Sequence, residues 1–238
     1  MIPVILSAGE GSRVGEETAD LPKWFLQVGD RRICEYQLDA LGALFDTAYV
    51  ALGHGFTDGE NSTAVIPSRD DINIKPLVFP NWKQTENAGT AAYALDQMSG
   101  TDDLLLICGD VIFSREFISG IVESYKKEPR FDQHSAITAF EGIQNQKTAV
   151  RWNNEDIITD YGKVEGHEEA GVFILNEDQI QKGQKLWEQN KNEWFPFIFS
   201  HVRSRPIRVT RDNHYEINTT VDLSVARKQL ASDKKNAF

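Results

Sequence analysis

Apolar and polar positions alternate in blocks through the first half of the chain. Four short apolar runs have the length of a β-strand, at residues 2–7, 48–52, 72–79 and 103–108. The last run contains Leu-Leu-Leu-Ile-Cys, which is typical of a strand that is buried on both faces of a parallel sheet. The first half of the chain therefore predicts a sheet with parallel strands at its centre.

Helical periodicity occupies the segments between these runs. One helix face is marked by apolar residues at helical spacing: Cys34, Leu38, Leu41 and Phe45. A second helix is expected at residues 88–98 and a third at residues 114–126, where Ser114 is the expected N-cap. The order β-α-β-α indicates an α/β fold with a mainly parallel, doubly wound, right-handed sheet.

The second half of the chain is less regular. Strands are expected at residues 135–140, 148–152, 157–161, 171–175 and 207–210. Asn153-Asn154 is a turn signal between two of these strands. Helices are expected at residues 177–190 and around Leu223, Ala226 and Leu230. Because no repeat, low-complexity tract or linker interrupts the pattern, we expect a single domain over residues 1–238 with a mixed β insertion in its second half.

Composition narrows the class of protein. The 238 residues include 25 Lys and Arg against 36 Asp and Glu, a formal net charge of -11, which argues against nucleic-acid or anionic-membrane binding. No apolar run approaches the ~20 residues of a bilayer span, and the run at residues 2–6 lacks the basic leader of a signal peptide. Cys34 and Cys108 lie in apolar patterns, as reduced cysteines of a cytoplasmic protein do.

The most informative motif follows the first expected strand. Residues 6–13 read Leu-Ser-Ala-Gly-Glu-Gly-Ser-Arg, and a Pro-Lys pair ends at Lys23. A strand that runs into Gly-x-Gly exposes backbone N–H groups that can bind a phosphate, and Arg13 and Lys23 add positive charge. Val14 occupies the third glycine position of a dinucleotide fingerprint, and no P-loop Gly-Lys-Ser/Thr follows, so neither of those motifs is present.

This motif resembles the signature of nucleotidyltransferases that make nucleotide sugars and related activated alcohols, Leu-x-Ala-Gly-x-Gly-x-Arg followed by Pro-Lys. The resemblance covers nearly the whole chain in ordered pieces and implies a small NTP transferase with a Rossmann-like, glycosyltransferase-A-like fold. It implies a nucleotide-binding half at residues 1–130 and an acceptor-binding half at residues 131–238. The implied triphosphate-binding and catalytic residues are Leu6, Ala8, Gly9, Gly11, Arg13 and Lys23.

Two further pieces belong to the nucleotide-binding half. Residues 86–92, Glu-Asn-Ala-Gly-Thr-Ala-Ala, match the segment that lines the nucleoside pocket in the family, which implies nucleoside contacts from Asn87, Gly89 and Thr90. Taken alone, the Gly-Thr pair is also explained as a helix cap. Asp110 follows a buried strand, at the edge where open α/β sheets bind ligands, and matches the family's Mg²⁺-binding Gly-Asp. A turn residue is the alternative for Asp110.

The sequence near the C-terminus departs from the family pattern. Where the family carries Ile-Asp-Thr-Pro-Glu-Asp-Leu, with a second metal carboxylate at its first Asp, this chain has Asn218. An amide oxygen can still bind Mg²⁺ but brings no charge. Asp222 forms a capping box with Thr219 and is not assigned to the metal.

The acceptor side is implied by the sequence around residues 160–172. Lys163 lies where the family has a lysine that contacts the acceptor phosphate, and Glu169 and Gly171 are expected to shape the acceptor pocket. A solvated surface lysine remains the alternative for Lys163. The aromatic stretch at residues 194–199 is a candidate for a pocket wall, for a contact between copies of the chain, or for ordinary core packing.

The resemblance implies transfer of a nucleoside monophosphate from an NTP to a phosphorylated small molecule, with Mg²⁺ as cofactor. A sugar 1-phosphate is the first acceptor to consider, which implies a role in nucleotide sugar biosynthesis. One alternative is cytidylyl transfer to an alcohol phosphate such as phosphocholine, with an aromatic pocket from Trp152, Tyr161 or Trp194. Another is a non-catalytic nucleotide-binding homologue, because of Asn218. A glycosyltransferase is less favoured because it needs no triphosphate loop and the chain has no Asp-x-Asp.

Overall fold

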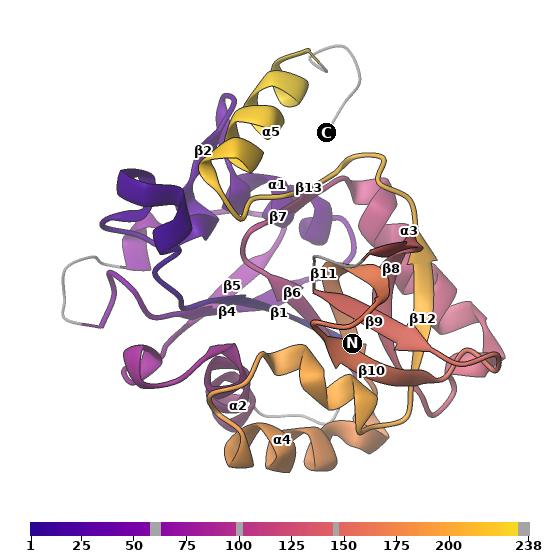
Figure 1. Ribbon diagram of the computed structural model, residues 1–238. Coiled ribbons are helices and arrows are strands. Elements are labelled where there is room, and N and C mark those ends of the chain that lie inside the picture. The colour runs from indigo at the N-terminus through magenta and orange to yellow at the C-terminus, as the bar shows by residue number, and fades with distance from the viewer. Residues whose placement is uncertain (58–62, 99–101, 145–147, 233–238) are drawn as a thin grey trace.

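The computed structural model describes residues 1–57, 63–98, 102–144 and 148–232. A large mixed sheet runs through the middle of this part of the chain, and helices lie on both of its faces (Figure 1). One side of the sheet is parallel, in the order β6-β1-β4-β5. These strands are β6 (Leu104–Cys108), β1 (Ile2–Ser7), β4 (Thr47–Leu52) and β5 (Asn73–Val78). The expected parallel α/β core is therefore confirmed.

The other side of the sheet is built mainly from antiparallel pairs. The long strand β11 (Gly166–Leu175) pairs antiparallel with β6, with β8 (Ser135–Gln144) and with β9 (Ala149–Trp152). Strand β10 (Ile158–Gly162) forms a hairpin with β9, and β12 (Ser204–Val209) pairs parallel with β8. The mixed β region predicted for the second half is thus continuous with the parallel core.

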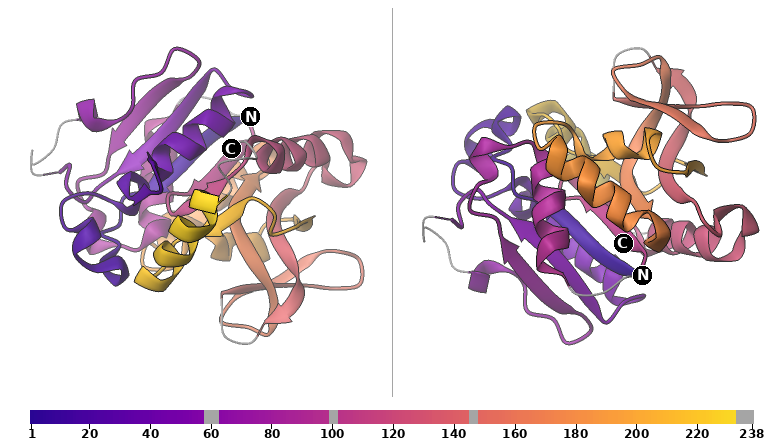
Figure 2. Two further views of the ribbon diagram at one scale, coloured as in Figure 1. Left: turned by 90° about the horizontal axis from the view of Figure 1, so that it is seen from above. Right: turned by 90° about the horizontal axis from the view of Figure 1, so that it is seen from below.

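The helices form two layers around the sheet. Helix α1 (Ile33–Gly42) lies on one face, whereas α2 (Asn87–Gln97) and α4 (Ile180–Gln189) cover the other face (Figures 1 and 2). Helices α3 (Arg115–Lys127) and α5 (Thr220–Ser232) pack into the same apolar cluster as α1. At the start of α3, the side chain of its N-cap residue accepts a hydrogen bond from the third helical residue at 3.2 Å, as expected from the sequence.

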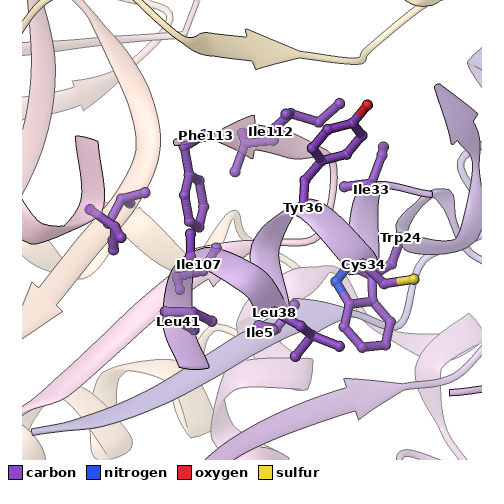
Figure 3. Packing of buried hydrophobic residues seen from close by; sticks show 14 of the residues in the cluster. Ile5, Trp24, Ile33, Cys34, Tyr36, Leu38, Leu41, Ile107, Ile112 and Phe113 are labelled. Carbon is purple, nitrogen blue, oxygen red and sulfur yellow. The ribbon is translucent and has the colours of Figure 1, made fainter. Parts of the chain in front are cut away.

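Successive side chains of the central strands point to opposite faces and so feed two apolar clusters. Ile5 and Ile107 join the cluster beneath α1, whereas Leu6 and Leu106 join the cluster beneath α2 and α4. In Figure 3, Leu38 of α1 lies beside Ile5 within the first cluster. Because both faces are covered, β1 and β6 are apolar along their whole length, which is the pattern that made them recognisable.

The structure departs from the expected elements at several places. Strand β11 begins at Gly166, not at residue 171, because its first half is polar and carries no strand-like apolar run. The expected helix at residues 177–190 is divided into a 3₁₀ turn (Glu177–Gln179) and α4. Two short strands, β7 (Val111–Phe113) and β13 (His214–Glu216), pair antiparallel with each other and were not expected.

Two predictions made from composition can also be compared with the structure. Both cysteines are free; Cys34 is buried in the core as expected, whereas Cys108 is partly exposed. None of the helices in the described ranges has the length and apolarity that a membrane span requires.

Candidate active site

A cavity of about 630 Å³ opens at the carboxyl ends of β1 and β6. The nucleotide-binding residues expected from the sequence that line it are Leu6, Ala8, Gly9, Gly11, Asn87 and Thr90. The expected catalytic, metal-binding and acceptor residues that line it are Arg13, Lys23, Asp110, Asn218 and Glu169. Gly89, Lys163 and Gly171 are not among its lining residues. Parallel strands of open α/β sheets bind ligands at this edge, so the cavity is the candidate active site.

A small polar cluster lies at the centre of the cavity. The Lys23 ammonium nitrogen lies 2.8 Å from Asp110 Oδ2 and 3.5 Å from Asn218 Oδ1. Arg13 Nη2 donates a hydrogen bond to Asn218 Oδ1 at 3.2 Å. Lys23 is 8% exposed, which is unusual for a lysine and requires a charged partner such as Asp110. Residues from three distant parts of the sequence thus meet at one point.

Gly11 makes room for the Lys23 side chain. Its φ of +67° is a left-handed conformation that residues with a Cβ rarely adopt. A Cβ atom at this position would approach Lys23 Cγ to 2.6 Å. The second glycine of the loop is therefore required both for the turn and for the passage of the lysine toward Asp110.

Gln37 is a buried residue of α1 that joins the segments carrying Lys23 and Asp110. Its Nε2 donates hydrogen bonds to the carbonyl oxygens of Cys108 at 2.9 Å and Val111 at 2.7 Å, on either side of Asp110. Its Oε1 accepts a hydrogen bond from Trp24 Nε1 at 2.9 Å. Gln37 has no exposed surface, which is unusual for a glutamine. Because burial cannot be read from the sequence, sequence analysis missed this residue.

The short β7–β13 ladder brings the C-terminal site residues to Asp110. Glu216 pairs with Val111 in the ladder, and the backbone N–H of Ile217 donates to the Asp110 carbonyl oxygen at 2.9 Å. Asn218 follows directly, and its side-chain Nδ2 donates to Glu216 Oε1 at 2.5 Å. Glu216 also lines the cavity. Sequence analysis did not single it out, although it stands two residues before a metal candidate.

Asp222 has the structural role expected of it. Its Oδ2 accepts hydrogen bonds from the backbone N–H of Asn218 at 3.1 Å and from the backbone N–H of Thr219 at 2.7 Å. The Thr219 hydroxyl also donates to it at 2.8 Å. Asp222 therefore holds the turn that begins α5, and it does not line the cavity.

The acceptor side of the cavity carries a buried carboxyl group. Glu169 Oε2 accepts a hydrogen bond from the backbone N–H of Gly171 at 2.7 Å. Burial, together with the charge of Glu216, raises the pKa of Glu169 well above its usual range. The Tyr161 hydroxyl lies in the same region, and burial raises its pKa as well. A raised pKa favours the protonated form of each group, which can donate as well as accept a hydrogen bond.

The aromatic wall of the cavity depends on a loop that docks on the start of α2. Asn87 Oδ1 accepts a hydrogen bond from the backbone N–H of Phe195 at 2.6 Å, and the Ala88 N–H donates to the Glu193 carbonyl oxygen at 3.1 Å. This docking places Trp194, which is 41% exposed, along the cavity. Phe195 lines the cavity too and is fully buried, so the aromatic stretch contributes both to the wall and to the core.

Lys163 and Trp152, two candidates for the acceptor side, do not line the cavity. Lys163 is exposed, just beyond the end of β10. Trp152 stacks on His167 with ring centroids 3.9 Å apart and is not a lining residue. Of the three aromatic candidates for an acceptor pocket, the cavity therefore includes Tyr161 and Trp194.

The donor atoms at the centre of the cavity suit a hard cation. Asp110 offers a carboxylate oxygen and Asn218 an amide oxygen, the kinds of ligand that Mg²⁺ prefers. The ammonium group of Lys23 already lies between these two oxygens, so a positive charge fits there. Within the described ranges no group of three or more His, Cys, Asp or Glu residues is arranged as a metal site. Substrate phosphates and water are needed to complete a Mg²⁺ shell here.

The α/β fold and a polar cavity beside a glycine loop are features of α/β proteins that transfer nucleotides. The family model of the MobA-like NTP transferase domain matches residues 3–179, and the chain belongs to this family. The protein is accordingly a nucleotidyltransferase. A comparison with curated protein sequences finds no match.

Solved structures support the same fold. The chain is similar to the CTP:phosphocholine cytidylyltransferase of Streptococcus pneumoniae, with a TM-score of 0.71, 13% identity, and 96% and 98% of the two chains covered. It is also similar to a putative glucose-1-phosphate thymidylyltransferase from Bacillus anthracis (TM-score 0.75, 16% identity, 100% and 97% covered). The inositol-1-phosphate CTP transferase from T. maritima matches with a TM-score of 0.75, 17% identity, and 99% and 97% covered.

Proposed function

We propose that the protein transfers a nucleoside monophosphate from an NTP to a phosphorylated small molecule, first of all a sugar 1-phosphate, and releases pyrophosphate. The observation that carries the proposal is the meeting of Arg13, Lys23, Asp110 and Asn218 beside the glycine loop. The three solved relatives named above act, by their names, on phosphocholine, a glucose 1-phosphate and an inositol 1-phosphate. Their shared chemistry supports a phosphorylated acceptor.

The reaction is a displacement at the α-phosphorus of the nucleotide. An acceptor phosphate oxygen forms the new P–O bond while the bond to pyrophosphate breaks, and pyrophosphate departs. Since the attacking oxygen is already ionised, no general base is needed, and the protein must position two anions and offset their repulsion. Bound Mg²⁺ would supply positive charge at the phosphates and would be held by Asp110 and Asn218.

The basic side chains of the cavity have separate roles in this scheme. Arg13, with its planar fork, binds the oxygens of the leaving pyrophosphate. Lys23 exchanges its contact with Asp110 for the α-phosphate and stabilises the charge that develops there. Glu169 can donate a hydrogen bond to a sugar hydroxyl in its protonated form, which its raised pKa favours.

A second candidate function is cytidylyl transfer to an alcohol phosphate that carries a quaternary ammonium group, such as phosphocholine. Tyr161, Trp194 and Glu169 line one cavity, and an aromatic face beside a carboxyl group suits such a cation. A cation bound beside Glu169 would favour its ionised form and lower its pKa. This candidate differs from the first in the acceptor and in specifying CTP as the nucleotide.

Pyrophosphate release tests both candidates. The purified protein is mixed with Mg²⁺, each of the common NTPs, and sugar 1-phosphates, inositol 1-phosphate or phosphocholine in turn. Release with a sugar 1-phosphate supports the first candidate, and release with phosphocholine alone supports the second. If no acceptor gives pyrophosphate with any NTP while nucleotides still raise the melting temperature, the protein binds nucleotides without catalysis, and the proposal is wrong.

A further inference from the structure

The amide group of Asn218 has two chemically different ends, and the structure gives each a different partner. Its oxygen, Oδ1, accepts from Arg13 at 3.2 Å and lies 3.5 Å from the Lys23 nitrogen. Its nitrogen, Nδ2, donates to Glu216 Oε1 at 2.5 Å. If the amide turned over, its N–H groups would point at two cations and its oxygen at a carboxylate, which is electrostatically unfavourable at both ends.

We propose that Glu216 is a positioning residue of the metal site, which aims Asn218 Oδ1 at the cation and supplies the negative charge that an amide ligand lacks. This inference rests on the proposed function, since it assigns a role within the same Mg²⁺ site. Asn218 remains the ligand, and Glu216 acts through it.

The backbone around Glu216 is held firmly enough for this role. Glu216 is paired with Val111 in the β7–β13 ladder, and the next residue, Ile217, donates to the Asp110 carbonyl oxygen at 2.9 Å. Asp222 holds the backbone N–H of Asn218 at 3.1 Å. The carboxylate of Glu216, the amide of Asn218 and the loop of Asp110 are therefore fixed relative to one another. Outer partners of this kind orient metal ligands and tune their affinity.

Glu216 and Asn218 form a matched pair of one carboxylate and one amide. A carboxylate at both positions would place two negative charges at hydrogen-bond distance. An amide at both positions would leave Asp110 as the only carboxylate among Asp110, Glu216 and Asn218. Exchanging the two side-chain types, in E216Q/N218D, keeps one carboxylate and one amide at the same two positions. The exchange thus separates the role of the pair from the role of either residue alone.

Binding of Mn²⁺ measures the metal site without any need for turnover. Free Mn²⁺ is followed by electron paramagnetic resonance while the wild type, E216A, E216Q and E216Q/N218D are titrated. The control is E188Q, because Glu188 is an exposed carboxylate of α4 that does not line the cavity. Circular dichroism and the melting temperature show that each variant is folded.

We expect E216A to weaken Mn²⁺ binding about 10- to 100-fold, as loss of an outer partner of a metal ligand does. E216Q should also weaken binding, whereas E188Q should leave it close to the wild-type value. The exchange E216Q/N218D should restore most of the lost affinity, which a merely structural role of Glu216 would not predict.

Two results would overturn the inference, and they have different meanings. If the wild type binds Mn²⁺ and E216A binds it equally well, or if E216Q/N218D is as weak as E216Q, the pairing role of Glu216 is wrong while the metal site stands. If the folded wild type binds no Mn²⁺, either alone or with a non-hydrolysable NTP analogue, the metal site itself is wrong, and the pyrophosphate assay then decides separately whether the transfer reaction remains.

Discussion

At the scale of single residues, the salt bridge between Lys23 and Asp110 joins two side chains to which the proposed reaction assigns a role. The two side chains are 10% and 24% exposed, so water weakens their attraction less than at the surface. In the free protein each offsets the other's charge, whereas a bound nucleotide offers phosphate oxygens to Lys23. Under the proposed function, Lys23 can leave Asp110, its partner in the free protein, and stabilise the transition state. Asp110 is itself a proposed ligand of the metal ion.

Replacing Lys23 with alanine should lower kcat by roughly two to four orders of magnitude, as loss of a key electrostatic donor does. The KM for the NTP should change less, because Arg13 and the glycine loop still bind phosphate. Steady-state pyrophosphate release at saturating substrate measures both constants.

The matched control for this substitution is Lys127→Ala. Lys127 also forms a salt bridge, with Glu123 at 2.7 Å, but its side chain is 74% exposed and belongs to α3, away from the cavity. Its loss should leave kcat unchanged. Turnover of K23A at the level of K127A would remove Lys23 from the mechanism.

At the scale of elements, β11 combines two environments in one strand. Its second half, from Val172 to Leu175, is buried among the core clusters, whereas Glu169 in its first half lines the cavity. The change falls at Gly171, where φ is +70° and the pairing with β8 shifts register. The bulge lets the Gly171 N–H point back to Glu169 Oε2.

Substituting Gly171 with alanine should lower the free energy of unfolding by roughly 1–3 kcal/mol, because the backbone conformation disfavours a side chain. The new Cβ would also approach Val111 Cγ1 to 2.6 Å. Since Glu169 is held by Gly171, the KM for the acceptor should rise as well. Urea unfolding and acceptor titrations measure the two effects.

Gly120→Ala is the control for the bulge. Gly120 lies within α3 and a Cβ there meets nothing within 4 Å. Alanine is favoured over glycine inside a helix by about 1 kcal/mol, so G120A should be slightly more stable than the wild type. Equal stabilities for G171A and G120A would show that the bulge does not require glycine.

At the scale of the whole molecule, the net charge of -11 does not prevent the basic side chains Arg13, Lys23 and Lys83 from lining the cavity, where they stand beside carboxylates. The fold also encloses a histidine that affects its stability. His214 is 8% exposed and lies against the rings of Phe117 and Phe140, and its Nε2–H donates to the Ala170 carbonyl oxygen at 2.9 Å. Burial lowers the pKa of His214 to about 4.

Stability should therefore decrease as the pH falls from about 6.5 to about 4, because the unfolded chain protonates His214 in this range and the folded chain does not. The slope from this one group is at most about 1.4 kcal/mol per pH unit. Glu169, whose pKa is raised, contributes a slope of opposite sign, because the folded protein keeps its proton to higher pH. The effect of His214 is thus measured as a difference between variants.

His214→Gln supplies that difference, since an amide can still donate to the Ala170 carbonyl oxygen but does not titrate. Urea unfolding of the wild type and H214Q at several pH values between 4 and 7 should show a loss of stability toward acid that is smaller in the variant. Parallel curves for the two proteins would mean that His214 titrates alike in the folded and unfolded chains.

Much of this molecule could be predicted from the order of its residues. The expected strand at residues 2–7 coincides with β1, and the other parallel strands were placed to within a residue or so at each end. Hydrophobic periodicity and backbone freedom act over a few residues, so a local pattern reports them directly. For the same reason the glycine loop with Arg13 and Lys23 could be recognised as a candidate phosphate site.

Other features were decided only by tertiary structure. Strands β7 and β13 are three residues long, too short for a periodic signal, and their pairing joins distant parts of the chain. That pairing brings Glu216 and Asn218 to Asp110, and a docked loop brings Trp194 to the start of α2. Burial then raises the pKa of Glu169. The sequence by itself determined the sheet, its helices and the phosphate loop, because these depend on neighbours along the chain; the acceptor side depends on neighbours in space, and only the folded chain brings those together.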